Sequence, residues 1–121
     1  HLLPAQTRDG LARAHRFDGY WRDVGTVESY WAAHQEFLSA EPPLDLDDPA
    51  WAVHTRGGRH SAARVLLDSA VDNSLISGGT RVLGNVHGSV LSPGVVVEEG
   101  ATVVDSVLLP GARVRAGATV T

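Results

Sequence analysis

The clearest pattern of hydrophobic and polar positions lies between Val65 and Thr121, where short motifs repeat. Three segments share the order Ser, aliphatic, Ile or Leu, two variable residues, Gly, two variable residues and Val, and they begin 15 and 17 residues apart, at Ser74, Ser89 and Ser106. A large aliphatic residue recurs in steps of five or six positions, at Leu91, Val97, Val103, Leu108, Val114 and Val120. Four positions after each of the first five stands a smaller residue: Val95, Ala101, Val107, Ala112 and Ala118.

This period fits neither an amphipathic helix, which repeats every 3.6 residues, nor a half-buried strand, which alternates every second residue. It predicts a triangular coil in which three short parallel strands make one turn and the large aliphatic side chain points inward. The smaller residue would pack beside it at the corner, and glycine would take the backbone angles that a β-carbon resists. A glycine-rich antiparallel sheet is the alternative. In such a sheet the turn glycines would separate strands of variable length, whereas here the glycines keep a constant offset from the aliphatic residues. The antiparallel sheet is therefore disfavoured. Gly78, Gly79 and Gly84 are interpreted as corners rather than as a phosphate loop.

The first 40 residues show a different pattern and carry all but one of the aromatic side chains. The mixed run 13–17 could form a strand, and from Val27 onward the pattern takes a helical period. Thr26 is placed as the helix N-cap, and Glu28 lies in the first turn, where the helix dipole favours a carboxylate. The predicted apolar stripe comprises Val27, Tyr30, Trp31, Phe37 and Leu38. His34 lies on the same stripe and is interpreted as a half-buried helix residue rather than a metal ligand.

Residues 41–64 are typical of a connecting segment. They contain Pro42-Pro43, an acidic run and Gly57-Gly58, and the only strand-like piece is 51–55. His54 and His60 have no nearby carboxylate, so metal binding there is disfavoured.

Composition narrows the function classes. The chain of 121 residues has a formal net charge of -4, which disfavours nucleic-acid binding, and its ten positive side chains are all arginine, which excludes lysine nucleophiles. There is no cysteine, and no apolar run approaches the length of a membrane span. We expect a soluble, cytoplasmic protein that binds neither nucleic acid nor membranes.

The segment 20–26, Tyr-Trp-Arg-Asp-Val-Gly-Thr, is the most conspicuous stretch outside the repeats. A turn between a strand and a helix can hold Asp23 rigidly, and Mg²⁺ takes carboxylate oxygens together with phosphate oxygens and water. The residues alone leave a second interpretation open and favour it: Asp23 is a turn residue, or it pairs with Arg22.

Residues 20–26, the following Val27-Glu-Ser-Tyr-Trp-Ala-Ala, the segments 48–55 and 73–79, and the hexapeptide repeats together resemble the glucose-1-phosphate adenylyltransferase family over about Leu2 to Thr121. The resemblance implies a mainly β fold, in which a left-handed parallel β-helix follows a short α/β remnant of a nucleotidyltransferase domain. It divides the chain into the end of that domain (1–40: strand, Asp-Val-Gly-Thr turn, helix), a connecting segment (41–64) and the β-helix (65–121), which is expected to be incomplete at its C-terminal end.

The family makes ADP-glucose and pyrophosphate from ATP and glucose 1-phosphate with Mg²⁺, in glycogen and starch synthesis. By resemblance, Asp23 is a catalytic carboxylate that holds the metal, and Trp21 and Arg22 lie beside the sugar-phosphate pocket. The β-helix is expected to serve allosteric control and the contacts of a homo-oligomer, a tetramer in this family. The family's nucleotide loop, other metal carboxylate and substrate lysines are absent, so the 121-residue chain alone is expected to be inactive.

Three alternatives remain open at this point: another hexapeptide-repeat sugar nucleotidyltransferase, a non-catalytic regulatory or assembly module, and an acyltransferase. Acyl transfer would need a histidine base at a coil junction, for which His87 is the candidate. His87 is instead interpreted as an exposed corner residue, because no neighbour in the sequence orients it.

Overall fold

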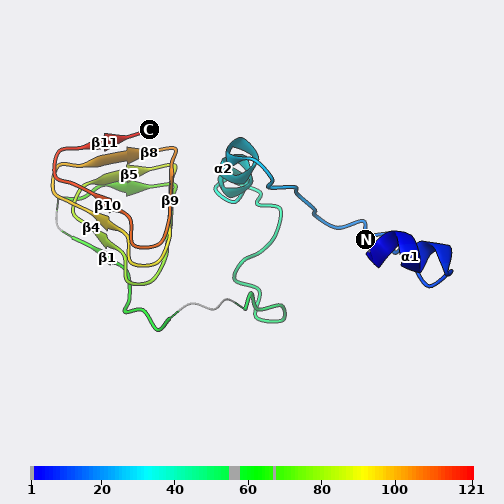
Figure 1. Cartoon of the computed structure of the whole chain (residues 1–121). Helices are drawn as coiled ribbons and strands as arrows, with labels where there is room; N and C mark the ends of the chain where they lie inside the picture. Colours follow the sequence, from blue (N-terminus) through cyan, green and yellow to red (C-terminus); the bar gives the residue numbers. More distant parts are fainter. Residues whose placement is uncertain (1, 55–57, 67) are drawn as a thin grey trace.

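The computed structural model describes residues 2–54, 58–66 and 68–121. Across these ranges, short strands that all pair in parallel wind into a stack of coils, and two helices precede them (Figure 1). The predicted parallel β-helix is therefore confirmed. The helices are α1 (Leu2–Arg8) and α2 (Val27–Glu36). Neither is both long and apolar enough to cross a lipid bilayer.

Each side of the stack is a parallel sheet in which strands from successive coils lie next to one another. Sheet A contains β1 (Arg64–Val65), β4 (Arg81–Val82), β7 (Val96–Val97) and β10 (Arg113–Val114). Sheet B contains β2 (Val71–Asp72), β5 (Asn85–His87), β8 (Thr102–Val104) and β11 (Thr119–Val120). Sheet C contains β3 (Leu75–Ile76), β6 (Val90–Leu91) and β9 (Val107–Leu108).

The core is a column of aliphatic side chains from all three sheets. Leu91, Val97 and Val103 are fully buried, and Val114 is 6% exposed, which confirms the inward positions that the period of six predicts. Ala101 also packs into the core as expected. Two of the smaller residues do not: Val107 is only half-buried and lines an outer groove, because its neighbour Leu108 takes the inward position on β9, and Ala118 in the last coil is exposed.

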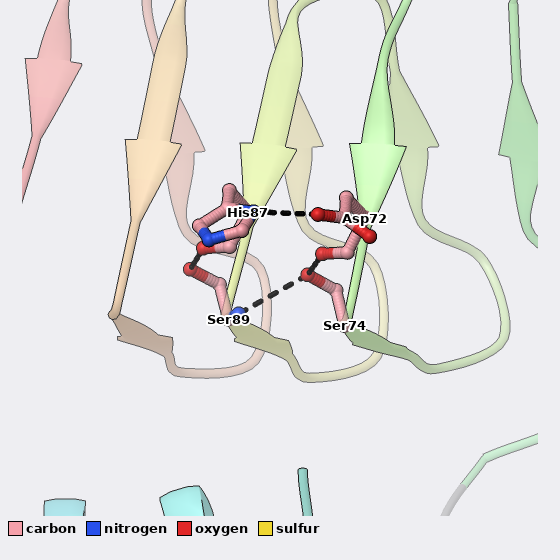
Figure 2. Close-up of polar contacts among 4 residues, drawn as sticks. All are labelled: Asp72, Ser74, His87 and Ser89. Atoms are coloured by element: carbon pink, nitrogen blue, oxygen red, sulfur yellow. Dashed lines mark hydrogen bonds and ion pairs between the residues drawn. The ribbon is translucent and has the colours of Figure 1, made fainter. Parts of the chain in front are cut away.

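A serine ladder at the corner between sheets B and C explains the repeated serine. The Ser74 hydroxyl donates to the carbonyl of Asp72 at 2.7 Å and accepts from the backbone N–H of Ser89 at 3.1 Å (Figure 2). Ser89 makes the same two contacts one coil later, to the His87 carbonyl and from the Ser106 N–H. Each of these hydroxyl groups therefore satisfies a backbone carbonyl at its own corner and a backbone N–H of the next coil. A hydrophobic side chain could make neither hydrogen bond.

The residue before each serine lies in the left-handed region of backbone space. These residues are Asn73, Gly88 and Asp105, with φ of 41°, 56° and 45°. Gly79 also has a positive φ, of 76°, and Gly78, Gly79 and Gly84 lie in turns between strands, which confirms their predicted place at corners. Asn, Asp and Gly are the residues that tolerate this region best, which is why a corner of this shape can recur in every coil.

One corner is two residues shorter than its equivalents. Val82 and Val86 are four positions apart, whereas Val97 and Val103 are six apart, and this accounts for the repeat spacings of 15 and 17 residues. At the short corner, a β-carbon on Gly84 would lie 2.3 Å from the Ala101 carbonyl oxygen, so the next coil passes directly against the glycine backbone.

The carboxylate of Glu98 connects two corners on the outside of the stack. One oxygen accepts from the backbone N–H of Ala116 at 2.9 Å, and the other pairs with the Arg113 guanidinium. The hydrogen bond from Ala116 and the contacts with Arg113 lower the pKa of Glu98 below its ordinary value of 4.5.

We expect Glu98 to stabilise the fold at neutral pH and to lose this effect in acid. Because its folded pKa is lowered, the contribution is complete above the ordinary pKa and disappears as the pH falls through the lowered one. Urea unfolding of the wild type and of Glu98→Gln should therefore differ at pH 7 and converge below about pH 4. A difference that stays constant over this range would show that the charge contributes nothing.

Two predicted strands outside the stack do not form. The segment 13–17 is irregular, and Figure 1 shows it crossing from α1 to α2 with no strand beside it. Residues 51–54 are also irregular, while Thr55 lies outside the described residues. Within the described ranges neither segment has a neighbouring strand to receive its backbone hydrogen bonds, and a lone extended segment is not stable as a strand.

Candidate functional site

Helix α2 begins where the sequence predicts. The Thr26 hydroxyl accepts from the Ser29 N–H at 3.1 Å, while the Thr26 N–H donates to the Ser29 hydroxyl at 3.0 Å. This capping box satisfies two backbone donors at the helix start and fixes the direction from which the chain enters. The helix ends at Glu36, so Phe37 is its C-cap and Leu38 follows it, contrary to the stripe predicted from the sequence.

The turn before α2 places Asp23 at the surface. Its Oδ1 accepts from the Gly25 N–H at 3.1 Å, which gives the turn a defined shape three residues before the N-cap. The side chain is exposed and forms no ion pair with Arg22 among the described residues. Asp23 is thus a turn residue, and it is also accessible to a ligand.

The described residues fit Mg²⁺ only as part of a larger site. No group of three or more His, Asp or Glu side chains gathers within the described ranges. Asp23 alone could supply one carboxylate, and Mg²⁺ characteristically binds one or two carboxylates together with substrate phosphates and water. The role of Asp23 as a metal ligand stays a prediction.

Arg22 and Tyr20 hold this segment against the other end of α2. The Arg22 guanidinium pairs with Glu36 at 2.7 Å, and the Tyr20 hydroxyl donates to the same carboxylate at 2.7 Å. The hydrogen bond to Glu36 raises the pKa of Tyr20. Trp21 takes no part in these contacts and is 76% exposed. The structure therefore gives Arg22 a structural partner, while a place for Trp21 and Arg22 beside a sugar-phosphate pocket stays a prediction.

An apolar groove of about 660 Å³ lies between the start of α2 and sheet C. The helix side contributes the residues that follow Asp23, and the sheet side contributes Val107 and Leu109. The full lining is Val24, Gly25, Thr26, Val27, Tyr30, Trp31, Val107 and Leu109. Asp23 does not line the groove but directly precedes the residues that do.

Two side chains of α2 bind the β-helix directly. The indole N–H of Trp31 donates to the Asp105 carbonyl at 2.6 Å, and the Gln35 amide donates to the Gly88 carbonyl at 3.1 Å. Trp31 lies on the predicted apolar stripe, whereas no role is predicted for Gln35 from the sequence. The only signal was their spacing of four, which places both on one helix face.

His87 has an orienting partner, which corrects the sequence interpretation. Its Nδ1 lies 3.0 Å from Asp72 Oδ2 on the neighbouring coil (Figure 2). Both side chains are exposed, as predicted for His87, but they lie at the ends of strands β2 and β5 rather than at a corner, and beside them is a hollow of about 160 Å³ on the outer face of sheet B. Asp72 and His87 stand 15 residues apart, the same offset as Ser74 and Ser89, so the repeat alignment already contained this contact.

His34 takes the half-buried helix position that the sequence predicts, whereas His54 and His60 lie at the surface. His34 is half-buried and its Nδ1 lies 2.8 Å from the carbonyl of Tyr30, one turn earlier in α2. His54 and His60 are exposed, and neither belongs to a cluster of metal ligands within the described ranges.

Comparison with known proteins connects both parts of the chain to one group of enzymes. The family model described as GlmU-like, C-terminal hexapeptide matches residues 49–121. The chain is similar to three proteins named glucose-1-phosphate adenylyltransferase. That of Acetivibrio thermocellus is 38% identical over 107 residues, which is 88% of this chain and 25% of the enzyme. That of Streptomyces avermitilis is 40% identical over 87% of this chain and 29% of the enzyme. That of Thermotoga maritima is 43% identical over 84% of this chain and 25% of the enzyme. The chain thus spans 25 to 29% of the length of these relatives.

Proposed function

Because the chain belongs to the GlmU-like, C-terminal hexapeptide family, we propose that it is the part of a glucose-1-phosphate adenylyltransferase that joins the end of the catalytic domain to the β-helix. The observation that carries this proposal is the identity of 38 to 43% to enzymes of that name over more than four-fifths of the chain. The aligned length is too great to be confined to the repeats, so it includes the Asp23 turn or α2 as well. These relatives are named adenylyltransferases, which favours nucleotidyl transfer over the alternative of acyl transfer with His87 as the base.

In the proposed reaction, an oxygen of glucose 1-phosphate attacks the α-phosphorus of ATP and pyrophosphate leaves, giving ADP-glucose. Bound Mg²⁺ would neutralise negative charge on the phosphates. Asp23 supplies one carboxylate for the metal, and the hydrogen bond from Gly25 fixes the direction of that carboxylate. Glu36 holds Tyr20 and Arg22, which keeps the segment before Asp23 against α2.

In the same proposal, the protein is a cytoplasmic homo-oligomer, a tetramer. Its β-helix serves allosteric control and forms contacts between subunits. An apolar row on the outside of sheet C supports a contact role, because Leu75, Val90 and Val107 are aligned on adjacent strands. Val90 and Val107 in this row are half-buried, while Leu75 and the nearby Leu109 are 37% and 58% exposed. Exposed apolar side chains that gather on one face mark surfaces that bind other protein.

The activity can be tested with a chimera in which residues 1–121 replace the matching segment of the Thermotoga maritima enzyme, with which they share 43% identity. We expect the chimera to form ADP-glucose from ATP and glucose 1-phosphate, and the 121-residue chain alone to form none. A chimera that folds and assembles like the unmodified Thermotoga enzyme but makes no ADP-glucose would contradict the proposal. Product formed by the isolated chain would refute the prediction that it is inactive.

A further inference from the structure

The carbonyl groups at one corner of the stack form a row along its axis. Gly88 and Asp105 occupy the same left-handed corner position in successive coils, and their N–H groups bond to the preceding coil. Their carbonyls accept hydrogen bonds from α2 instead, Gly88 from Gln35 and Asp105 from Trp31. The β-helix therefore offers α2 a set of acceptors at the spacing of its coils.

The spacing of α2 matches that row. Residues four apart on a helix lie about 6 Å apart along its axis, and adjacent parallel strands are about 4.8 Å apart. Long side chains such as Trp and Gln can span the small difference, so Trp31 and Gln35 bind consecutive coils. The order of the contacts also fixes a direction: Trp31, nearer the start of α2, binds the later coil, so the start of the helix lies toward β9. Figure 1 places α2 beside that face of the stack.

The segment 20–26, which contains Asp23, is attached to both ends of α2. The capping box of Thr26 and Ser29 connects it to the start of the helix. The contacts of Tyr20 and Arg22 with Glu36 connect the preceding residues to its end. A shift of α2 along the stack would therefore carry the Asp23 carboxylate with it.

We propose that Trp31 and Gln35 are positioning residues, which set the height of α2 on the β-helix and thereby the place of the Asp23 carboxylate. The part of this inference that concerns catalysis rests on the proposed function. The part that concerns attachment of α2 does not. Displacement of a catalytic group by about 1 Å can cost on the order of a hundredfold in rate, so even a small shift of α2 has a measurable effect.

Attachment is tested on the 121-residue chain by amide hydrogen exchange. The double variant Trp31→Phe with Gln35→Leu keeps an aromatic ring at position 31 and a side chain of similar size at position 35, but removes both donors. We expect faster exchange in α2 and unchanged exchange in β5 and β8. Gln35→Lys keeps a donor of similar reach and should exchange like the wild type, and His34→Gln is the control on the same helix. Wild-type exchange of α2 in the double variant would overturn the inference.

Positioning is tested on the chimera with the same variants. We expect the double variant to lower kcat about tenfold and to raise the Mg²⁺ concentration needed for half-maximal rate, with little change in KM for ATP. Gln35→Lys should retain most of the activity. A double variant with wild-type kcat and Mg²⁺ dependence would overturn the inference.

Two further outcomes are also decisive. If the wild-type chimera is inactive, the proposed function fails, while hydrogen exchange still decides the attachment. If β5 and β8 lose protection in the double variant, the single variant Trp31→Phe replaces it in both measurements and is judged by the same results.

Discussion

Replacing Asp23 by asparagine in the chimera should lower the turnover of ADP-glucose formation by on the order of a hundredfold, with little change in Tm. Asparagine has the size of aspartate, and its side-chain oxygen can still accept from the Gly25 N–H, so the turn before α2 should survive. What it lacks is the negative charge that Mg²⁺ prefers in a ligand. Steady-state kinetics at saturating ATP and glucose 1-phosphate, together with thermal unfolding, measure the two effects.

The matched control is Asp18→Asn, which removes a carboxylate five residues earlier in the same exposed segment. Asp18 pairs only with Arg16, at 3.1 Å, within the described residues, and both side chains are largely exposed. We expect no change in turnover from this control. If Asp23→Asn also turned over at the wild-type rate, Asp23 would be a turn residue and nothing more.

The second large effect is expected at the short corner of the stack. In Gly84→Ala the new β-carbon would meet two backbone carbonyl oxygens, those of Ala101 at 2.3 Å and Glu98 at 2.8 Å. Backbone atoms cannot rotate away as a flexible side chain can, so the next coil must move. We expect the free energy of unfolding of the 121-residue chain to fall by about 2–3 kcal/mol, measured by urea denaturation.

Gly58→Ala is a control in which the added methyl group has room. Among the residues that the structure describes, its β-carbon would have no neighbour closer than His60 Nε2 at 3.9 Å, so stability should hardly change. Gly94→Ala tests a different mechanism, because the space is open but φ is 75°, and it should cost about 1 kcal/mol. Equal stability of Gly84→Ala and Gly58→Ala would mean that the two coils separate easily at the short corner.

The β-helix could be predicted from the sequence because every coil gives its residues the same environment. A buried position such as Val97 has an equivalent above and below it, so the requirement for an aliphatic side chain is repeated along the chain. The same alignment contains the contact of Asp72 with His87, but these residues are neighbours only across two coils and are 15 positions apart along the sequence.

The N-terminal part could be predicted only locally. The N-cap Thr26 acts through residues three positions away, so its pattern is visible in the sequence. The contacts of Trp31 and Gln35 are with backbone carbonyls 74 and 53 residues away, and a carbonyl leaves no trace in the residue type. The failed strand at 13–17 has the same cause, since a strand depends on a partner that local composition does not reveal.

The direction of the serine ladder has a consequence for how the protein is made. Each serine oxygen accepts from the N–H of the serine in the following coil, at 3.1 Å for Ser74 and 3.0 Å for Ser89. The acceptor therefore belongs to the part of the chain that is synthesised first. Once a coil has formed, its serine oxygen is in place to accept the serine N–H of the coil that follows, so the ladder can be extended in the order in which the chain is synthesised.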